Sequence, residues 1–517
     1  MDFLDLNDLS STVAKRYNYD FLNSLNLDKD VIRRLSLHLD RLSVGSDLVY
    51  LTPLGKDNDP DVILSKIDKL FDENSEKIND SLRDLELSNR DKFGPRSISQ
   101  PWSSRLPGLL SYFESSNDNV NDLLPMPRDA SLERNLRPMS LDASMKYLKN
   151  NTNSGLPYYT RKSKVKDTVI REFNYLIKRE DPCILFTRTQ EGNKTRNVWG
   201  YPIVDTLNEM RFYRPLLKLQ SSLNWRSALR GPDYVDKEIT NMMLKSRASN
   251  LSLISIDFSA FDASVGKHLQ ERCFEYIKLC FNREYSSEID YIRDRFNNIE
   301  LVTPTGIFKG SHGVPSGATF TNEVDSLAQY LIASNSGCII KDMVQIQGDD
   351  GAYAIRSADQ DKFKSSFVKA GLNVNEEKSY VSNEYLVYLQ RLYDYKYINN
   401  NGLIGGIYPI YRAVNRLIYQ ERFSDFVEFE LKGKDYYSIR TLSILENCKY
   451  HPLFKDFVKI IFDLDKYSLD FTDGSLAKYN SFVQQTSGTV GFLNNQIGDD
   501  IKGIRSFESY KIIKELA

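Results

Sequence analysis

Three aspartates stand where they could bind metal ions. Asp257 lies at the end of the apolar run LSLISIDF (251–258), and Asp349 and Asp350 follow much later, between two further apolar runs. Grouped carboxylates repel one another unless a cation neutralises them, and Mg²⁺ prefers oxygen ligands of this kind. Two such ions can activate an attacking hydroxyl and stabilise a leaving phosphate oxygen, with Mn²⁺ as a substitute of similar hardness. The three residues therefore predict phosphoryl transfer.

The tripeptide Gly-Asp-Asp occurs twice, at 348–350 and at 498–500, so alone it is a weak signal. The first copy separates MVQIQ (343–347) from AYAI (352–355), a pattern that predicts a hairpin with the four residues 348–351 at its tip. The second copy has no alternating pattern around it and no partner segment downstream, so we interpret it as a surface turn.

The elements around these aspartates alternate between strands and helices. The nearly continuous apolar run 251–258 is typical of a strand buried on both faces. Two apolar stripes at helical spacing follow it: Leu269, Cys273, Tyr276, Ile277, Cys280, and then Phe320, Val324, Leu327, Leu331. Between the stripes, the sequence Thr-Pro-Thr-Gly (303–306) predicts a hairpin turn.

A third helix should follow the hairpin of the first Gly-Asp-Asp copy. Ser357 and Gln360 have the spacing of a capping box, Gly371 is placed to end the helix, and Phe363, Phe367 and Val368 should face inward. The order strand, helix, helix, hairpin, helix, strand is that of a split βαβ sheet packed on helices. We therefore expect a helix-rich, mixed α+β fold.

Composition narrows the class of protein. The 517 residues are 41% hydrophobic, which excludes a disordered chain, and no apolar run is long enough to span a membrane. The acidic start does not resemble an export signal. Five Cys without a CxxC pair and four His without ligand spacing argue against disulfides and zinc.

The net charge of −2 disfavours a protein that coats nucleic acid with its outer surface. The average hides a gradient, because residues 1–100 hold 19 acidic and 14 basic residues whereas residues 161–196 hold five acidic and ten basic ones. A basic strip inside an otherwise neutral chain is consistent with an enclosed channel for anions, although a solvated charged face is the alternative.

Several segments resemble motifs of viral RNA-dependent RNA polymerases, in particular those of picobirnaviruses, with the partitivirus enzymes as near relatives. The palm motifs are IDFSAFDAS (256–264), PSGATFTNEVDS (315–326) and QIQGDDGAY (345–353). TNSGLP (152–157), KTRNVWG (194–200) and YLQRLY (388–393) resemble the template-entry, nucleotide-channel and primer-grip motifs. The resemblance is strong over residues 150–400 and weak outside them.

This resemblance implies a right-handed polymerase closed by its fingertips. We expect an N-terminal region with fingers at 1–250, palm at 251–265, a fingers insertion at 266–312, palm at 313–398, and thumb with C-terminal tail at 399–517.

The resemblance also implies roles for single residues. Asp257 and Asp349 would bind two Mg²⁺ ions, with Asp350 beside them, and Lys378 would protonate the leaving pyrophosphate. Without the family context, these residues read as a strand-end cap, turn aspartates and a solvent-exposed lysine.

Recognition of the ribonucleotide is assigned in the same way. Asp262 would accept a hydrogen bond from the ribose 2′-hydroxyl, near a helix start formed by Ser316, Gly317 and Thr321. Many relatives carry Asn where this chain has Asp325, so either one of two neighbouring carboxylates holds a proton or the role moves to Asn322.

Contacts to phosphates and to RNA complete the predicted site. Lys194 and Arg196, followed by Arg188, would bind the triphosphate. Five residues of the template-entry and primer-grip motifs would contact RNA: Ser154, Gly155, Pro157, Gln390 and Arg391.

We expect a monomeric RNA-directed RNA polymerase that transcribes and replicates a double-stranded RNA viral genome. Its partners would be RNA, ribonucleoside triphosphates and a capsid protein, with no membrane, in the virion interior or host cytoplasm.

Two alternatives stay open: reverse transcription, and an RNA-binding capsid-associated protein without activity. Initiation with or without a primer is also open, since GTVGFLNNQIGDD (488–500) reads equally as an initiation loop or a surface tail.

Overall fold

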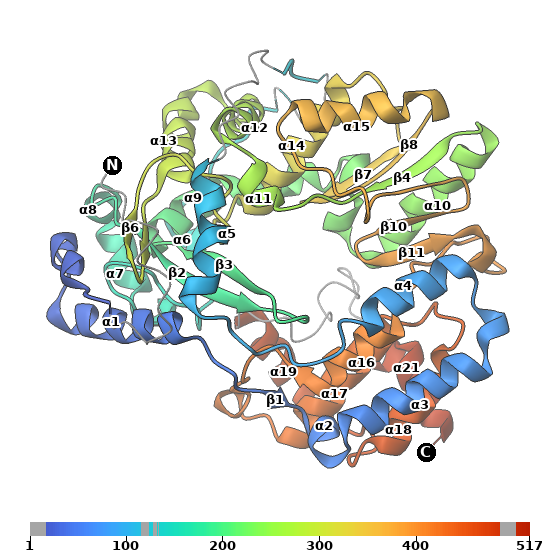
Figure 1. The fold of residues 1–517 in the computed structure, drawn as a ribbon. Helices are drawn as coiled ribbons and strands as arrows, with labels where there is room; N and C mark the ends of the chain where they lie inside the picture. The colour runs from blue at the N-terminus through green and yellow to red at the C-terminus, as the bar shows by residue number, and fades with distance from the viewer. Residues whose placement is uncertain (1–16, 115–123, 128–131, 133, 486–502, 517) are drawn as a thin grey trace.

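The computed structural model describes residues 17–114, 124–127, 132, 134–485 and 503–516. The lobes form a ring in Figure 1, with fingers on the left and top, palm at the upper right and thumb at the lower right. The second Gly-Asp-Asp copy and the segment 488–500 lie outside the described residues. Among the residues described, no helix has both the length and the apolar character needed to cross a membrane.

The palm sheet is built around a strand buried on both faces. Its four antiparallel strands have the order β7-β8-β4-β9: Val344–Gln347, Asp350–Ile355, Ser252–Ile256 and Tyr380–Ser382. Ile254 and Ile256 of β4 pack against one set of helices: α12 (Lys267–Cys280), α14 (Thr321–Asn335) and α15 (Gln360–Lys369). Leu253 points to the other face and packs against α10 (Pro232–Ala248). The predicted order of elements around the aspartates is confirmed.

Three local predictions in the palm were wrong. The hairpin turn has two residues, Gly348 and Asp349, because Gln347 already pairs with Asp350; Gly348 supplies the positive φ that such a turn needs. Ser357 does not cap α15: its hydroxyl bonds that of Ser252 at 2.8 Å, and residues 357–359 form a 3-10 turn. Val368 is 60% exposed, since only Phe363 and Phe367 of that stripe face the core.

The fingers contain a second sheet of order β3-β2-β5-β6: Thr195–Gly200, Cys183–Thr189, Leu301–Thr303 and Gly306–Phe308. The helices around it are α1 (Lys29–Val44), α5 (Trp102–Glu114), α6 (Leu141–Met145), α7 (Lys166–Arg171), α8 (Phe173–Ile177), α9 (Ile203–Gln220) and α13 (Ser286–Asn298). The predicted turn at 303–306 joins β5 to β6. Because β5 pairs with β2 in parallel, residues 301–308 of the fingers insertion (266–312), which interrupts the palm in sequence, complete the fingers sheet.

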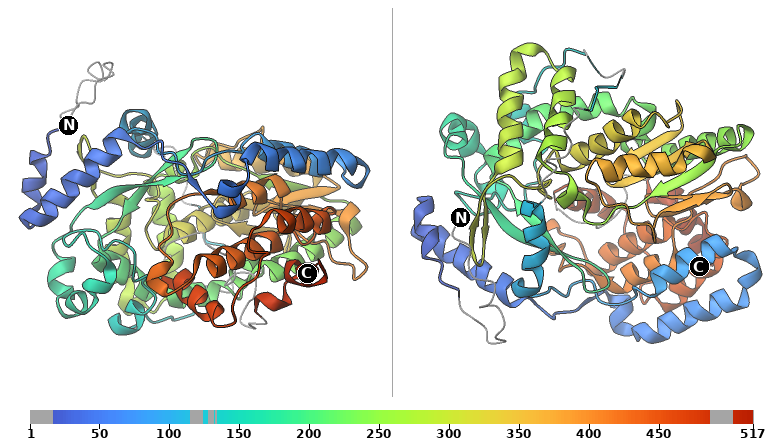
Figure 2. Two further views of the ribbon diagram at one scale, coloured as in Figure 1. Left: turned by 90° about the horizontal axis from the view of Figure 1, so that it is seen from below. Right: turned by 45° about the horizontal axis from the view of Figure 1, so that its top comes forward.

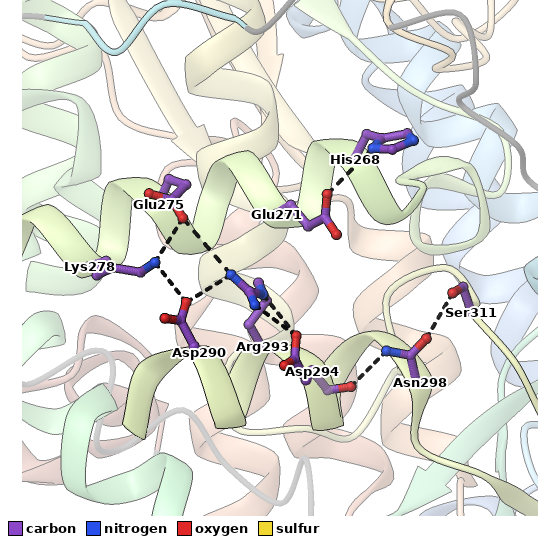
Figure 3. A network of polar contacts seen from close by, with 9 residues as sticks. All are labelled: His268, Glu271, Glu275, Lys278, Asp290, Arg293, Asp294, Asn298 and Ser311. Carbon is purple, nitrogen blue, oxygen red and sulfur yellow. Dashed lines mark hydrogen bonds and ion pairs between the residues drawn. The ribbon is translucent and has the colours of Figure 1, made fainter. Parts of the chain in front are cut away.

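Charged side chains join α12 to α13 on the surface of the insertion (Figure 3). Lys278 of α12 lies 2.7 Å from Asp290 of α13, and Arg293 bonds the same carboxylate at 2.8 Å. Surface pairs of this kind contribute at most about 1 kcal/mol each. The buried apolar stripe of α12, Leu269 to Cys280, therefore stabilises the α12–α13 pair more than these ion pairs do.

The thumb is helical and is preceded by a hairpin. The hairpin strands are β10 (Tyr385–Tyr388) and β11 (Arg391–Asp394). The thumb helices are α16 (Ile410–Ile418), α17 (Gly433–Glu446), α18 (Phe454–Leu464), α19 (Ser475–Gln485) and α21 (Glu508–Leu516). A short strand, β12 (Tyr419–Gln420), pairs with β1 (Tyr50–Leu51) from the N-terminal part of the chain.

Residues 45–101, which we call the strap, leave the fingers after α1, run along the thumb and return to the fingers at α5 (Figures 1 and 2). The strap contains α2 (Pro53–Asp57), α3 (Pro60–Glu73) and α4 (Asp80–Arg90). Ile63 and Ile67 of α3 and Leu82 of α4 belong to the thumb core, whereas α1 and α5 belong to the fingers core. Within the expected N-terminal region and fingers (1–250), the amphipathic faces of α3 and α4 therefore pack on the thumb, and the domain boundaries stay a prediction.

Candidate active site

The register of the palm sheet brings the predicted metal ligands together. Ile256 pairs with Gly351, so the next residue of that chain segment, Asp257, comes level with Asp350 and beside the turn residue Asp349. The backbone of Asp257 is fixed on the other side by the Ser379 hydroxyl, to which its N–H donates at 3.2 Å. Asp257, Asp349 and Asp350 thus meet at one end of the two central strands, β4 and β8.

The carboxylates of this group disfavour one another's ionised forms. Burial raises the pKa of Asp350 to about 7, and the negative charges of Asp349 and Asp257 add to the rise, opposed by Arg412. Burial also raises the pKa of Asp257, assisted by Asp349 and opposed by Lys378 and Lys194. Mutual repulsion of this kind is relieved when a divalent cation binds.

Among the described residues no set of three or more His, Cys, Asp or Glu side chains already has metal-binding geometry. The aspartates nevertheless fit Mg²⁺, which keeps several waters and takes only one or two carboxylates plus substrate phosphates. Their oxygen-only donor set suits such a site, and the raised pKa values of Asp257 and Asp350 are consistent with carboxylates that favour a nearby cation.

Lys378 lies in the turn before β9 and is exposed, as the alternative interpretation expected. Its positive charge nevertheless acts on Asp257 and is the strongest influence that lowers the pKa of that carboxyl group. The position suits a proton donor beside the metal ligands, and its role as an acid stays a prediction.

The predicted ribose pocket is assembled around Asp262, in the short helix α11 (Phe261–Ser264). The Ser316 hydroxyl donates a hydrogen bond to the Asp262 carboxylate. Gly317 adopts φ +131°, and a Cβ there would lie 2.2 Å from the carbonyl oxygen of Trp199. Only glycine allows this close backbone approach. The predicted helix start at Ser316 and Gly317 was wrong, because α14 begins at Thr321 and these two residues lie in the loop before it. The Thr321 hydroxyl donates to the Pro315 carbonyl at 2.9 Å, so it shapes this loop.

The structure separates Asn322 from Asp325. Asn322 accepts a hydrogen bond at 2.7 Å from the Gln347 side chain, beside the Gly348 turn. Asp325 is buried, and no described group hydrogen-bonds its Oδ1. Burial, then the charges of Asp262 and Asp349, raise the pKa of Asp325 well above its usual value. A carboxyl group with a raised pKa that keeps its proton can act as a donor, as an asparagine does, and the choice between Asp325 and Asn322 as the ribose partner stays a prediction.

The β2–β3 hairpin carries the predicted phosphate-binding cations toward this site. Lys194 contributes a positive charge near Asp257, and Arg196 contributes one near Asp262. Arg188 lies on the same hairpin, and its Nε donates to Glu421 of the thumb at 3.3 Å. Lys194 and Arg196 therefore lie near the carboxylates, and their contact with a triphosphate stays a prediction; Arg188 is engaged by the thumb.

Residues of the template-entry motif form a tight loop before α9. Ser154 is buried and accepts from the Thr160 N–H at 3.1 Å, while its own carbonyl accepts from Ile203 at 2.7 Å. A Cβ at Gly155 would lie 2.4 Å from the Tyr201 carbonyl, and Pro157 follows a cis peptide bond. These contacts fix the loop, and binding of template to its surface stays a prediction.

The primer-grip motif forms the turn and second strand of the β10–β11 hairpin. Gln390 sits in the turn with φ +62°. Arg391 donates to the carbonyls of Gly406 and Asn447, at 3.1 and 3.2 Å, and so joins the hairpin to the thumb. Contact of either residue with a primer stays a prediction.

Sequence reasoning missed several residues of the site because distant segments supply them. Tyr112 of α5 lies beside Ser316; burial, and next the Asp262 charge, raise its pKa. Glu209 of α9 accepts from the Thr319 N–H at 2.6 Å and so holds the loop that carries Ser316. Arg412 of α16 contributes a positive charge near Asp350. None of these residues belongs to a local motif, so no signal in their own segments could identify them.

Comparison with known proteins agrees with this geometry. A family model described as viral RNA-dependent RNA polymerase matches residues 109–397. The potential RNA-dependent RNA polymerase of a human picobirnavirus is 29% identical over 457 residues, covering 82% of this chain and 81% of that protein. The RNA-directed RNA polymerase of Cryptosporidium parvum virus 1 is 23% identical over 287 residues, covering 48% and 53% respectively.

Solved structures match over nearly the whole chain. The crystal structure of the RNA-dependent RNA polymerase of a human picobirnavirus has a TM-score of 0.79 at 24% identity and covers 99% of this chain and 100% of that one. A deletion mutant of its insertion loop has a TM-score of 0.77, with the same identity and coverage. These matches confirm the helix-rich, mixed α and β right-hand fold expected from the sequence.

Proposed function

Because the chain belongs to the viral RNA-dependent RNA polymerases, we propose that this RNA-directed RNA polymerase extends RNA by a two-metal mechanism at Asp257, Asp349 and Asp350. The observation that carries the proposal is the meeting of these three carboxylates at one end of the central strands β4 and β8. Burial and mutual repulsion raise the pKa of Asp257 and of Asp350 there. Such a group is costly to the fold unless cations are part of its function.

Asp257 and Asp349 would hold the ions, with Asp350 beside them. When bound, two Mg²⁺ ions, or Mn²⁺ in their place, lower the pKa of the attacking hydroxyl and neutralise the leaving group. In the reaction, the RNA 3′-oxygen forms a bond to the α-phosphorus of a ribonucleoside triphosphate, and the bond from that phosphorus to pyrophosphate breaks. Lys378 gives a proton to the departing pyrophosphate.

The remaining residues bind and select the nucleotide. Lys194 and Arg196 neutralise the triphosphate and hold it against the carboxylates. Asp262, oriented by Ser316, accepts a hydrogen bond from the ribose 2′-hydroxyl, and protonated Asp325 donates one. This pair distinguishes ribonucleotides from deoxyribonucleotides, which have no 2′-hydroxyl to offer.

We further propose a monomeric enzyme that transcribes and replicates a double-stranded RNA genome inside the virion, in contact with a capsid protein. The similarity to the picobirnavirus protein supports this setting. Polymerase activity in purified particles, together with the mass of the free protein in solution, tests it; a protein absent from particles would contradict it.

The central test is RNA synthesis by the purified protein with Mg²⁺, an RNA template and four ribonucleotides. Asp349→Asn should reduce synthesis by at least about a hundredfold, as expected when a group acting on the transition state is lost. Asp499→Asn, the same change in the second Gly-Asp-Asp copy, is the matched control and should leave synthesis intact. Full activity of Asp349→Asn would refute the metal assignment.

A second arm offers deoxynucleotides on the same template, because their efficient incorporation would indicate reverse transcription instead. RNA binding that needs no metal, with no incorporation under any divalent ion, would indicate an inactive RNA-binding protein.

A further inference from the structure

Glu191 stands at the tip of the β2–β3 hairpin, and its carboxylate joins three separate parts of the chain. Its Oε2 lies 3.2 Å from Nε of Arg96 in the strap, and its Oε1 lies 3.3 Å from Nη1 of Arg412 in the thumb. The side chain is only 16% exposed, so solvent screens these pairs less than it screens surface pairs. One carboxylate therefore joins the tip of the β2–β3 hairpin, which we call the fingertip, to both the strap and the thumb.

A second carboxylate strengthens the same junction. Glu421, just after β12, lies 3.3 Å from Nε of Arg188 and 3.9 Å from Nη2 of Arg96. Its backbone carbonyl accepts a hydrogen bond from the Thr189 hydroxyl at 3.3 Å. Arg96 thus bridges two carboxylates, one on the hairpin and one on the thumb.

Glu191 also lies among cations that repel one another. Burial alone would raise the pKa of Glu191, but Arg412, Arg96 and Arg416 outweigh it and lower that pKa to about 2, so the group is ionised at neutral pH. Burial lowers the pKa of Lys92, and so do the positive charges of Arg412, Lys378 and Lys194, while Glu191 opposes them. Without the Glu191 charge these cations would be driven apart.

The hairpin tip is short, which couples Glu191 to the phosphate-binding residues. The Gln190 N–H donates to the Lys194 carbonyl at 2.9 Å and closes the tip, so Lys194 follows Glu191 by three residues within one turn. Arg196 pairs across the hairpin with Arg188, which Glu421 holds. A displacement of the tip therefore moves Lys194 and Arg196 relative to the carboxylates.

We infer that Glu191 is a positioning residue for nucleotide binding, which sets the places of Lys194 and Arg196 by tying the fingertip to the strap and thumb. The inference rests on the proposed function, since it takes Lys194 as a triphosphate contact. It predicts a defect in the affinity for nucleotides and no defect in the chemical step.

The test compares Glu191→Gln, Lys194→Ala and the double variant in steady-state RNA synthesis. Glu191→Gln keeps the shape and removes the charge; we expect the KM for ribonucleotides to rise about tenfold, as for the loss of one charge-assisted contact, with kcat within about twofold. Lys194→Ala should raise KM similarly, and the double variant should raise KM by less than the product of the two single effects, because Glu191 acts partly through Lys194 and otherwise through Arg196.

Glu86→Gln is the matched control. Glu86 of α4 is buried and accepts hydrogen bonds from the Ile410 and Tyr411 N–H groups at 2.7 and 3.1 Å, so it also ties the strap to α16, away from the hairpin. This variant should lower the melting temperature and leave KM unchanged. If Glu191→Gln does not fold, Arg96→Gln breaks the same junction from the strap side and should raise KM in the same direction.

Two results would overturn the inference while leaving the proposed function in place: an unchanged KM in Glu191→Gln when Lys194→Ala raises it, or an equal rise in Glu86→Gln. Multiplied effects in the double variant would also overturn it. An unchanged KM in Lys194→Ala would remove the proposed triphosphate contact and the inference with it.

Discussion

Binding of Mg²⁺ should depend steeply on pH because of Asp350. Burial and the neighbouring carboxylates raise its pKa from 3.8 to about 7. That difference corresponds to about 4 kcal/mol of unfavourable interaction with the ionised form. Since the folded pKa exceeds the unfolded one, the metal-free protein should lose stability as pH rises from about 4 to about 7.

A bound divalent cation reverses this preference, because it favours the ionised carboxylate. Below pH 7 the cation must displace a proton from Asp350, so the apparent Mg²⁺ affinity should fall by up to about tenfold for each pH unit. Above about pH 8 most Asp350 carboxyl groups have already lost their proton, and the affinity should level off.

The assay is the rise in melting temperature on Mg²⁺ titration at pH 6.0, 7.0 and 8.0, without RNA or nucleotide. We expect the midpoint concentration to fall by up to about tenfold between pH 6 and 7 and by much less between pH 7 and 8. Asp350→Asn should bind Mg²⁺ more weakly and lose most of this pH dependence. Equal midpoints at pH 6 and 8 for the unmodified protein would refute the reasoning.

Three further predictions concern the ribose pocket. Asp325→Asn should keep kcat/KM for ribonucleotides within about threefold because the buried carboxyl already carries a proton, whereas Asp325→Ala should lose about tenfold; equal losses would contradict a protonated Asp325. Tyr112→Phe should reduce the preference for ribonucleotides over deoxynucleotides by about three- to tenfold, because it removes the hydroxyl that lies beside Ser316 and Asp262; an unchanged ratio would contradict this. Gly317→Ala should reduce synthesis by at least about tenfold through strain, while Gly402→Ala, also at positive φ but with nothing within 4 Å of its Cβ, should leave synthesis unchanged.

The palm could be predicted from the sequence because its signals are local. The apolar run that ends at Asp257 and the turn glycine Gly348 each specify a conformation within a few residues, and the order of motifs supplies the rest. The errors arose where a local pattern allowed two outcomes. The Ser357 hydroxyl, for example, hydrogen-bonds with the Ser252 hydroxyl and does not cap the first backbone N–H groups of α15.

The remainder of the site depends on contacts that no local pattern contains. An amphipathic helix such as α3 shows that Ile63 and Ile67 are buried, but it does not say which lobe buries them. Tyr112 and Glu191 likewise acquire their surroundings only when segments far apart in the sequence meet. Long-range packing, and not side-chain chemistry, set the limit of the prediction.

The strap has a consequence for how the polymerase is made. Helices α3 and α4 are synthesised early, yet the apolar faces of Ile63, Ile67 and Leu82 are covered by thumb residues that leave the ribosome hundreds of residues later. Contacts so distant in sequence form slowly and expose apolar surface meanwhile. A chain interrupted before α16 would carry an uncovered strap, and so would be prone to aggregation or available to chaperones. The strap helices can therefore bury these apolar faces only after the thumb has been synthesised.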